Sequence, residues 1–462
     1  MFPVSAEFKT AVRRGHTATV RAEVWRGETF LRSLEVTDGS VEIDSRRAQR
    51  RTCTLVVPAT KPTFDLEAAW NTYLSIKTAS GGPYATYTAL NASAATYGDL
   101  PEITGYDEVQ VDDGLIPTTP FSDVTPFGNE VRVWRGIVVD APDYPTYASL
   151  RSIASYTALA ATHDTYGGMA QALGTVEVTE EVPLGVFVMT DVEVEDSADG
   201  ATMTIVGVDR SKRIADAGWI DPVSIATATI PDAIVAVLTD RWMGVETDFP
   251  VLAQTIPATV LGLKDSGSGK DPWGDVQKFA EAGGRDLHFD GIGVAVLPPV
   301  VDPATATPVE TYIEDSEAML LSAKRGLSSD TTRNGIVMTG EGTNVDPPVR
   351  AVVFDEDPTS PTYRYGPFGE RPEFISSPLV LTTADATTAA AAELTKRKGA
   401  EEAVEWTQIC DPSLDAGDVI KIRNTGTRLD KVVVLDRVTI PLAVTGAMSG
   451  IARTVRVLTE AE

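Results

Sequence analysis

Residues 18–58 read ATVRAEVWRGETFLRSLEVTDGSVEIDSRRAQRRTCTLVVP. Apolar and polar side chains alternate along this stretch, and β-branched residues are frequent in it. The pairs Arg26-Gly27 and Asp38-Gly39 are typical of tight turns between strands. The stretch therefore predicts an antiparallel β meander near the start of the chain.

The same alternation returns further along the chain, after an interruption. It is found in VRVWRGIVVD (131–140), TVEVTE (175–180), VFVMTDVEVED (186–196) and ATMTIVGVD (201–209). We therefore predict one β domain over residues 1–210, interrupted by insertions at about residues 60–128 and 142–173.

A short motif repeats in these insertions: Thr or Ser, then Tyr, two residues, and Leu or Met. The tyrosines of the motif are Tyr87, Tyr97, Tyr147, Tyr156 and Tyr166. Tyr and Leu three residues apart lie on one face of a helical turn, and Thr or Ser is a suitable N-cap for it. Two interpretations stay open: a low-complexity segment that packs on itself, or an aromatic surface that contacts a partner or a glycan.

Residues 211–325 show helical patterns and predict a small α/β domain. Pro231 and Asp232 precede an apolar stripe typical of a capped helix, and PWGDVQKFAEAGG (272–284) predicts a second helix that ends at two glycines. The segment RDLHFDGIGVAVLPP (285–299) predicts a hairpin that turns at Asp290-Gly291.

Residues 326–462 predict a second β domain with one helix. The strand-like segments are GIVMTG (335–340), PVRAVVF (348–354), VEWTQI (404–409), DVIKIR (418–423), KVVVLD (431–436) and ARTVRVL (452–458), and the helix is Ala-rich and covers residues 384–397. The expected fold class is α+β, mainly β: two β domains of the barrel or sandwich type with the small α/β domain between them.

The charge of the chain limits its partners. Its 462 residues, enough for about three domains, carry a formal net charge of −27, which repels nucleic-acid phosphates and anionic membrane surfaces. We therefore expect neither specific nucleic-acid binding nor membrane insertion. Residues 1–51 carry a net charge of +3, and the remaining residues carry a net charge of −30. The basic residues Arg46, Arg47, Arg50 and Arg51 are candidate contacts to an acidic partner.

Few residues offer catalytic or metal chemistry. The three histidines, His16, His163 and His288, lie outside any metal-ligand spacing, and no GxSxG motif is present. The Gly-rich run 265–271 lacks the first glycine and the final hydroxyl of a phosphate loop. We predict no catalytic residue, cofactor or metal, although a carboxylate pair could lie among the 66 Asp and Glu residues.

The two cysteines, Cys53 and Cys410, lie in strand-like runs and are expected to be core thiols in a reducing compartment. The N-terminal segment lacks the apolar core of a signal peptide, so we expect the protein to be made in the cytoplasm.

Several stretches, taken in order, resemble the tail hub or tail-tip baseplate proteins of tailed bacteriophages, especially a minor tail protein family of actinobacterial phages. They include GHTATVRAEVWRG (15–27), PLGVFVMTDVEVED (183–196), VGVDRSKRIADAGW (206–219), PWGDVQKFAEAGGRDLHFDGIGVAVLPP (272–299), TTRNGIVMTGEG (331–342), DPTSPTYRYGPFGERPEFISSPL (357–379) and DPSLDAGDVIKIR (411–423). The resemblance covers most of the chain apart from the Tyr motifs.

The resemblance implies two domains similar to the tail-tube subunit. Three copies would then present six such domains to the sixfold tube and threefold symmetry to the tip. The implied function is a homotrimeric hub ring in the virion tail tip, bound to a distal tail or tail-tube protein and a tip or fibre protein, through which DNA passes. The alternatives are a host-glycan-binding tail protein that uses the Tyr motifs and a tail-associated cell-wall hydrolase.

Overall fold

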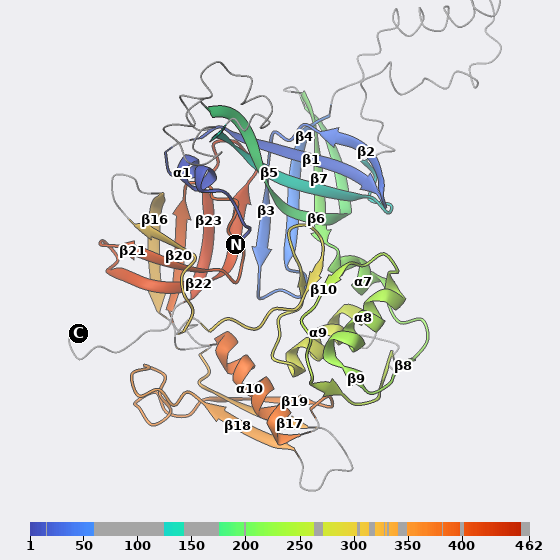
Figure 1. Cartoon of the computed structure of the whole chain (residues 1–462), viewed down its shortest axis with the longest axis vertical. Helices are drawn as coiled ribbons and strands as arrows, with labels where there is room; N and C mark the ends of the chain where they lie inside the picture. Colours follow the sequence, from blue (N-terminus) through green and yellow to red (C-terminus); the bar gives the residue numbers. More distant parts are fainter. Residues whose placement is uncertain are drawn as a thin grey trace, which may run out of the picture.

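The structure, a computed structural model, describes residues 1–14, 16–59, 124–142, 175–197, 200–262, 271–302, 305–313, 319–327, 329, 332–340, 349–380, 382–397 and 402–453 (Figure 1). The chain is mainly β, as predicted. The five tyrosines of the repeated motif, His163 and most of the Gly-rich run lie outside these residues.

One large antiparallel sheet dominates the structure. Its central path runs β16-β20-β23-β22-β3-β4-β7-β6-β5-β1-β2; off this path, β21 pairs with β22, and β15 pairs in parallel with β21. The N-terminal strands are β1 (Ala18–Arg26), β2 (Thr29–Leu34), β3 (Asp38–Asp44), β4 (Arg51–Pro58), β5 (Glu130–Pro142), β6 (Thr175–Ser197) and β7 (Gly200–Asp209). The C-terminal strands are β15 (Glu310–Ile313), β16 (Leu320–Leu327), β20 (Glu402–Gln408), β21 (Val419–Asn424), β22 (Leu429–Pro441) and β23 (Met448–Arg453).

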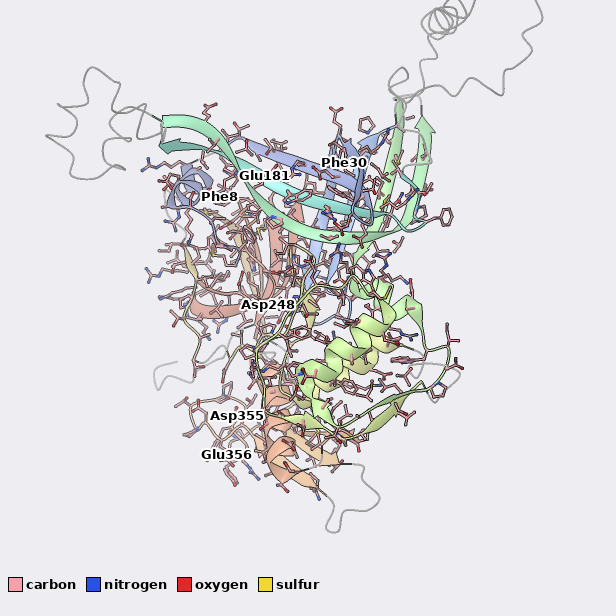
Figure 2. All side chains as sticks on the ribbon, turned by 45° about the vertical axis from the view of Figure 1, so that its right-hand side comes forward. Phe8, Phe30, Glu181, Asp248, Asp355 and Glu356 are labelled. Carbon is pink, nitrogen blue, oxygen red and sulfur yellow. The ribbon has the colours of Figure 1, made fainter. Side chains whose placement is uncertain are left out.

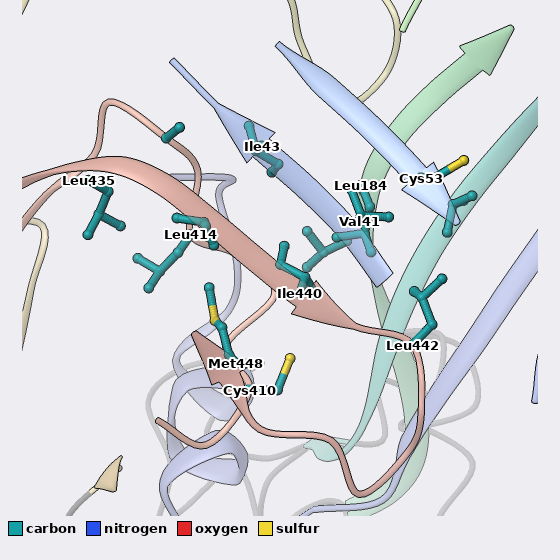
Figure 3. Close-up of a cluster of buried hydrophobic side chains, with 14 of the residues drawn as sticks. Val41, Ile43, Cys53, Leu184, Cys410, Leu414, Leu435, Ile440, Leu442 and Met448 are labelled. Atoms are coloured by element: carbon teal, nitrogen blue, oxygen red, sulfur yellow. The ribbon is translucent and has the colours of Figure 1, made fainter. Parts of the chain in front are cut away.

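The N-terminal and C-terminal strands of this sheet meet where β3 pairs with β22, between Val41 and Ile440 among other residues. The side chains beneath this seam form one hydrophobic core with members from both ends of the chain (Figure 3). Cys53 and Cys410 are among them, buried and unpaired as expected. Whether each half also forms a tube-like barrel, with boundaries at residues 210 and 326, stays a prediction.

A helical region lies between the two halves in the sequence and beside the sheet in space (Figure 1). Its helices are α7 (Ser211–Ala217), α8 (Ile230–Arg241) and α9 (Pro272–Ala282), and short strands β8 (Val223–Ile225), β9 (Ala228–Thr229), β10 (Thr247–Asp248), β11 (Thr255–Ile256), β12 (Thr259–Leu261), β13 (His288–Phe289) and β14 (Ala295–Val296) accompany them. Thr229 caps α8 by accepting a hydrogen bond from the Asp232 amide, and the predicted hairpin forms between β13 and β14.

A smaller sheet closes the lower part of the molecule in Figure 1. In it, β17 (Gly335–Gly340) lies between β18 (Arg350–Phe354) and β19 (Pro372–Ser377), and α10 (Thr383–Arg397) covers one face. Buried Ile336, Met338 and Leu394 belong to the core between this sheet and the helix. The Ala-rich helix was therefore predicted correctly.

The predicted meander is wrong in two respects. Asp38-Gly39 begins β3 instead of forming a turn. Gly39 has a φ of +130°, and a Cβ atom there would lie against the Thr54 carbonyl oxygen, so the position requires glycine. In addition, β2 is the edge strand at one end of the path, whereas β3 lies at its centre. The meander is thus two hairpins that are separated in the sheet.

Two further features were not predicted. Helix α1 (Ala6–Arg14) buries Phe8 and Val12 in the main core. The strand β15 lies before residue 326 and β16 begins before it and ends at Leu327, yet both belong to the large sheet. No helix among the described residues is long and apolar enough to cross a bilayer.

Candidate functional site: the arginine junction

The four arginines that the sequence singled out lie in the loop between β3 and β4 and at the first residue of β4, Arg51. Two of them, Arg46 and Arg47, have side chains that are 55% and 50% exposed. Arg46 pairs with Asp436, and Arg47 pairs with Glu42 at 2.7 Å. These two arginines are accessible to a partner.

Arg50, in contrast, is buried inside the chain. Its Nη1 donates to Asp286 Oδ2 at 2.6 Å and contacts His288 Nδ1 at 3.0 Å. Its Nη2 donates to the Ala416 carbonyl oxygen. One guanidinium therefore connects the start of β4 to the β13 hairpin and to the loop before β21.

Arg51 is also buried and is bound from three directions. Its Nε donates to the Phe289 carbonyl oxygen at 3.2 Å and its Nη1 to the Leu184 carbonyl oxygen at 2.9 Å. Its Nη2 pairs with Asp415, and its backbone amide donates to Asp209 Oδ2 at 2.8 Å. We call Arg50, Arg51, Asp286, His288 and Asp415 the arginine junction, because they join the N-terminal strands, the helical region and the C-terminal strands.

The charges of the junction are set by burial and by the two guanidinium groups. Burial, followed by the charge of Arg50, lowers the pKa of His288 to about 3. Because an arginine can only donate, Nδ1 of His288 must accept the hydrogen bond from Arg50, which requires a neutral imidazole. Burial alone would raise the pKa of Asp415, but Arg51 and Arg50 hold it at about 2. The junction is therefore a set of compensated charges in which both arginines are buried and both carboxylates are partly exposed.

The four arginines therefore do not share the predicted docking role equally. A partner that bound Arg50 or Arg51 would have to open the junction, whereas Arg46 and Arg47 are free to be approached. Sequence reasoning missed Asp286 and Asp415 as partners. The sequence signal for such partners was the run RRAQRR (46–51) in an acidic chain, because arginines that become buried need carboxylates to pair with.

A hollow of about 660 Å³ lies between α1 and β5. Its lining includes the carboxylates of Glu7 and Glu177 and the basic side chains of Arg14 and His16. Burial, followed by the charge of Arg135, lowers the pKa of His16. The hydrolase alternative can be tested at this hollow by replacing Glu7 and Glu177 with Gln and assaying activity on purified cell envelope. Among the described residues, no group of three or more His, Cys, Asp or Glu side chains could hold a metal ion.

No protein-family model matches the sequence, and no curated protein is significantly similar to it. Solved structures do match. The tail protein from Neisseria meningitidis MC58 aligns over 95% of this chain and 96% of its own, with a TM-score of 0.53 and 11% identity. The 43 kDa tail protein of prophage MuSo2 from Shewanella oneidensis aligns over 94% of this chain and 98% of its own, with a TM-score of 0.49 and 12% identity.

A third match is the prophage tail protein gp18 from Listeria monocytogenes EGD-e, which covers 94% of each chain with a TM-score of 0.47 and 8% identity. At 11% identity, the match to the Neisseria tail protein describes the fold alone. The fold shared with the Neisseria tail protein extends over nearly the whole of both chains.

Proposed function

Since the chain shares the fold of the Neisseria tail protein, we propose that it is a structural component of a phage tail tip: a homotrimeric hub ring that adapts the sixfold tail tube to the threefold tip. The observation that carries this proposal is the alignment with the Neisseria tail protein over nearly the whole of both chains. The assignment to actinobacterial phages rests on the sequence resemblance alone.

The architecture suits a ring component that must stay rigid. The seam between β3 and β22 and the arginine junction tie distant parts of the chain into one body, so the two halves of the sheet cannot separate without breaking a continuous core. In the proposed ring the two halves would act as the two tube-like units, which gives six units in three copies.

A ring in this position would form part of the DNA conduit. Basic side chains in its wall would retain phosphates by counterion release, so we expect a neutral or acidic wall. The net charge of −27 can supply one. The proposed neighbours are a distal tail or tail-tube protein and a tip or fibre protein, with Arg46 and Arg47 as accessible basic contacts.

The mass of the assembly tests the proposal. One chain has a mass of 49.2 kDa, so light scattering should give about 148 kDa or a multiple of it. The tube and tip proteins are added in a second sample, because hub proteins can require them for assembly. A chain that stays monomeric at tens of micromolar in both samples would contradict the proposal.

The host-binding alternative is favoured by one observation. Pro142 and Thr175 are paired at the ends of β5 and β6, so residues 143–174, with three of the motif tyrosines, connect two adjacent strand ends. Replacing residues 143–174 by Asn-Gly should therefore leave a folded protein. Normal assembly with lost adsorption to host cells would support host binding, and normal adsorption would exclude it for this insertion.

A further inference from the structure

The solvent side of strands β1, β2 and β5 carries an ordered row of aromatic and basic side chains. Phe30 packs edge-on against Trp25 with 5.6 Å between ring centroids, and the Arg132 guanidinium lies 4.1 Å from the Trp25 ring centroid. Next to them, the Arg21 guanidinium lies 3.7 Å from the Trp134 ring centroid. We call these five residues the Trp–Arg face. Figure 2 labels Phe30 on this side of the sheet, and Phe8 on α1 at the opposite end of the strands.

The two arginines of this face differ in their partners. Arg21 is neutralised, because it pairs with both Glu181 and Glu23. Arg132 lies directly opposite Glu23 across the strands, but both oxygens of Glu23 are engaged, one by Arg21 and one by the Trp25 indole N–H at 3.0 Å. Among the described residues Arg132 therefore contacts an aromatic ring and no carboxylate.

This arrangement is a prepared site for an anion. Stacking on Trp25 holds the Arg132 side chain in one orientation, so little rotamer freedom remains to be lost when a carboxylate binds. Phe30 beside it is 48% exposed, which leaves an apolar surface next to the unpaired cation. Trp and Arg are the residue types that contribute most binding energy at protein interfaces.

A complementary surface occurs on the far ends of β6 and β7. β6 extends past its pairing with the first residue of β5, Glu130, and its last residues pair only with β7 (Figure 2). Asp191, Glu193 and Glu195 are exposed and alternate along this extension, so they lie on one face of it. Their carboxylate groups form no ion pair or hydrogen bond with another described residue, although their backbones pair with β7. We call these two strand segments, residues 191–197 of β6 and 200–204 of β7, the acidic arm.

We propose that the acidic arm of one copy docks on the Trp–Arg face of the next copy, with a carboxylate of the arm bound by Arg132. This inference rests on the proposed trimer and names the contact that closes it. The two surfaces differ from each other, so the contact is head-to-tail, and three such contacts close a ring. Complementary charge and the exposed Phe30 explain why a second copy fits this face.

The test is a charge exchange measured by the mass of the assembly. R132E should replace the attraction by repulsion and raise the dissociation constant of the trimer at least tenfold, and E193K/E195K should do the same. Combining R132E with E193K/E195K should restore the trimer mass. R350E is the matched control, because Arg350 is an exposed strand arginine on β18 outside both surfaces, and it should leave the mass unchanged.

The outcomes separate this inference from the proposed function. A wild-type trimer that R132E and E193K/E195K leave intact would overturn the inference and keep the hub. A combined variant that stays dissociated would also overturn it. A wild type that never forms a trimer, with or without the tube and tip proteins, would overturn both. If R132E proves unstable, E193K/E195K still tests the inference, because both substitutions change exposed side chains and should leave the chain folded.

Discussion

Arginines of two regions of this molecule behave in opposite ways. In the arginine junction, Arg50 and Arg51 are buried, and their guanidinium groups bind carboxylates, an imidazole and carbonyl oxygens of the same chain. On the Trp–Arg face, Arg132 is partly exposed and stacks on Trp25. The residue type is the same, but its partners decide whether it holds the fold together or is available to another molecule.

Position in the sheet explains the difference. Arg50 and Arg51 stand just before and at the start of β4, where the helical region and the C-terminal loop 411–418 converge, so both must be paired inside the chain. Arg132 stands within β5 on the side away from the core, where no further layer of described residues supplies a carboxylate.

The largest effect on folding is expected from Arg51→Ala. The substitution leaves Asp415, which is only partly exposed, without its Arg51 partner, and it removes the donors to the Leu184 and Phe289 carbonyl oxygens. Loss of one partner of a buried pair costs about 3–5 kcal/mol. Urea denaturation should show a decrease of this size in the free energy of unfolding.

Arg47→Ala is the matched control for that measurement. Arg47 lies in the same loop and pairs with Glu42, but its side chain is half exposed, so its loss should cost less than about 1 kcal/mol. Equal losses for Arg51→Ala and Arg47→Ala would break the distinction between buried and accessible arginines.

A pH series on wild type and His288→Asn sharpens the account of the junction. The pKa of His288 is lowered from 6.5 to about 3 in the fold. Below pH 6.5, the imidazole is therefore protonated in the unfolded chain but stays neutral in the folded chain. Stability should therefore fall as the pH drops from 6.5 towards 3, by about 2 kcal/mol between pH 7 and pH 5.

His288→Asn keeps an acceptor for Arg50 and cannot titrate. Its unfolding free energy should change about 2 kcal/mol less than that of the wild type over the same pH interval. Parallel curves for the two proteins would show that the imidazole is not held neutral in the junction. Below pH 4, both proteins should lose further stability, because Asp415 has a pKa of about 2 in the fold.

The smallest effect on folding is expected from Arg132→Ala. A cation–aromatic contact at a partly exposed site contributes about 0.5–1 kcal/mol, so thermal unfolding of the isolated chain should change little. Arg51→Ala and Arg132→Ala thus remove the same type of side chain. The first should lower the stability of the fold, and the second should weaken the assembly. A large loss of folding stability in Arg132→Ala would place Arg132 with the junction.

Much of the local structure could be predicted from the sequence. The apolar stripe and caps of α8, the two glycines after α9 and the Ala-rich α10 each have short-range causes, and all three helices form as expected. The hairpin at Asp290 has a local cause as well, because Asp290 Oδ1 accepts the amides of Ile292 and Val294.

The long-range pairings could not be predicted in this way. Alternation marks β3 and β22 as strands, but nothing in either segment indicates that they lie next to each other although they are almost 400 residues apart. The same holds for Arg50 and Arg51, whose burial depends on Asp286 and Asp415 from two other regions. A run of arginines predicts a basic surface unless the carboxylates that cover it are known.

A reconstruction of the assembled ring by electron cryomicroscopy tests the account most directly. It should show three copies around a channel with a neutral or acidic wall, with Arg50 and Arg51 enclosed within each copy and the Trp–Arg face covered by the acidic arm of a neighbour. A ring without threefold symmetry would contradict the hub. A wall lined by Arg and Lys, or a Trp–Arg face left open to solvent, would contradict the division between arginines that hold the fold together and arginines that bind a neighbour.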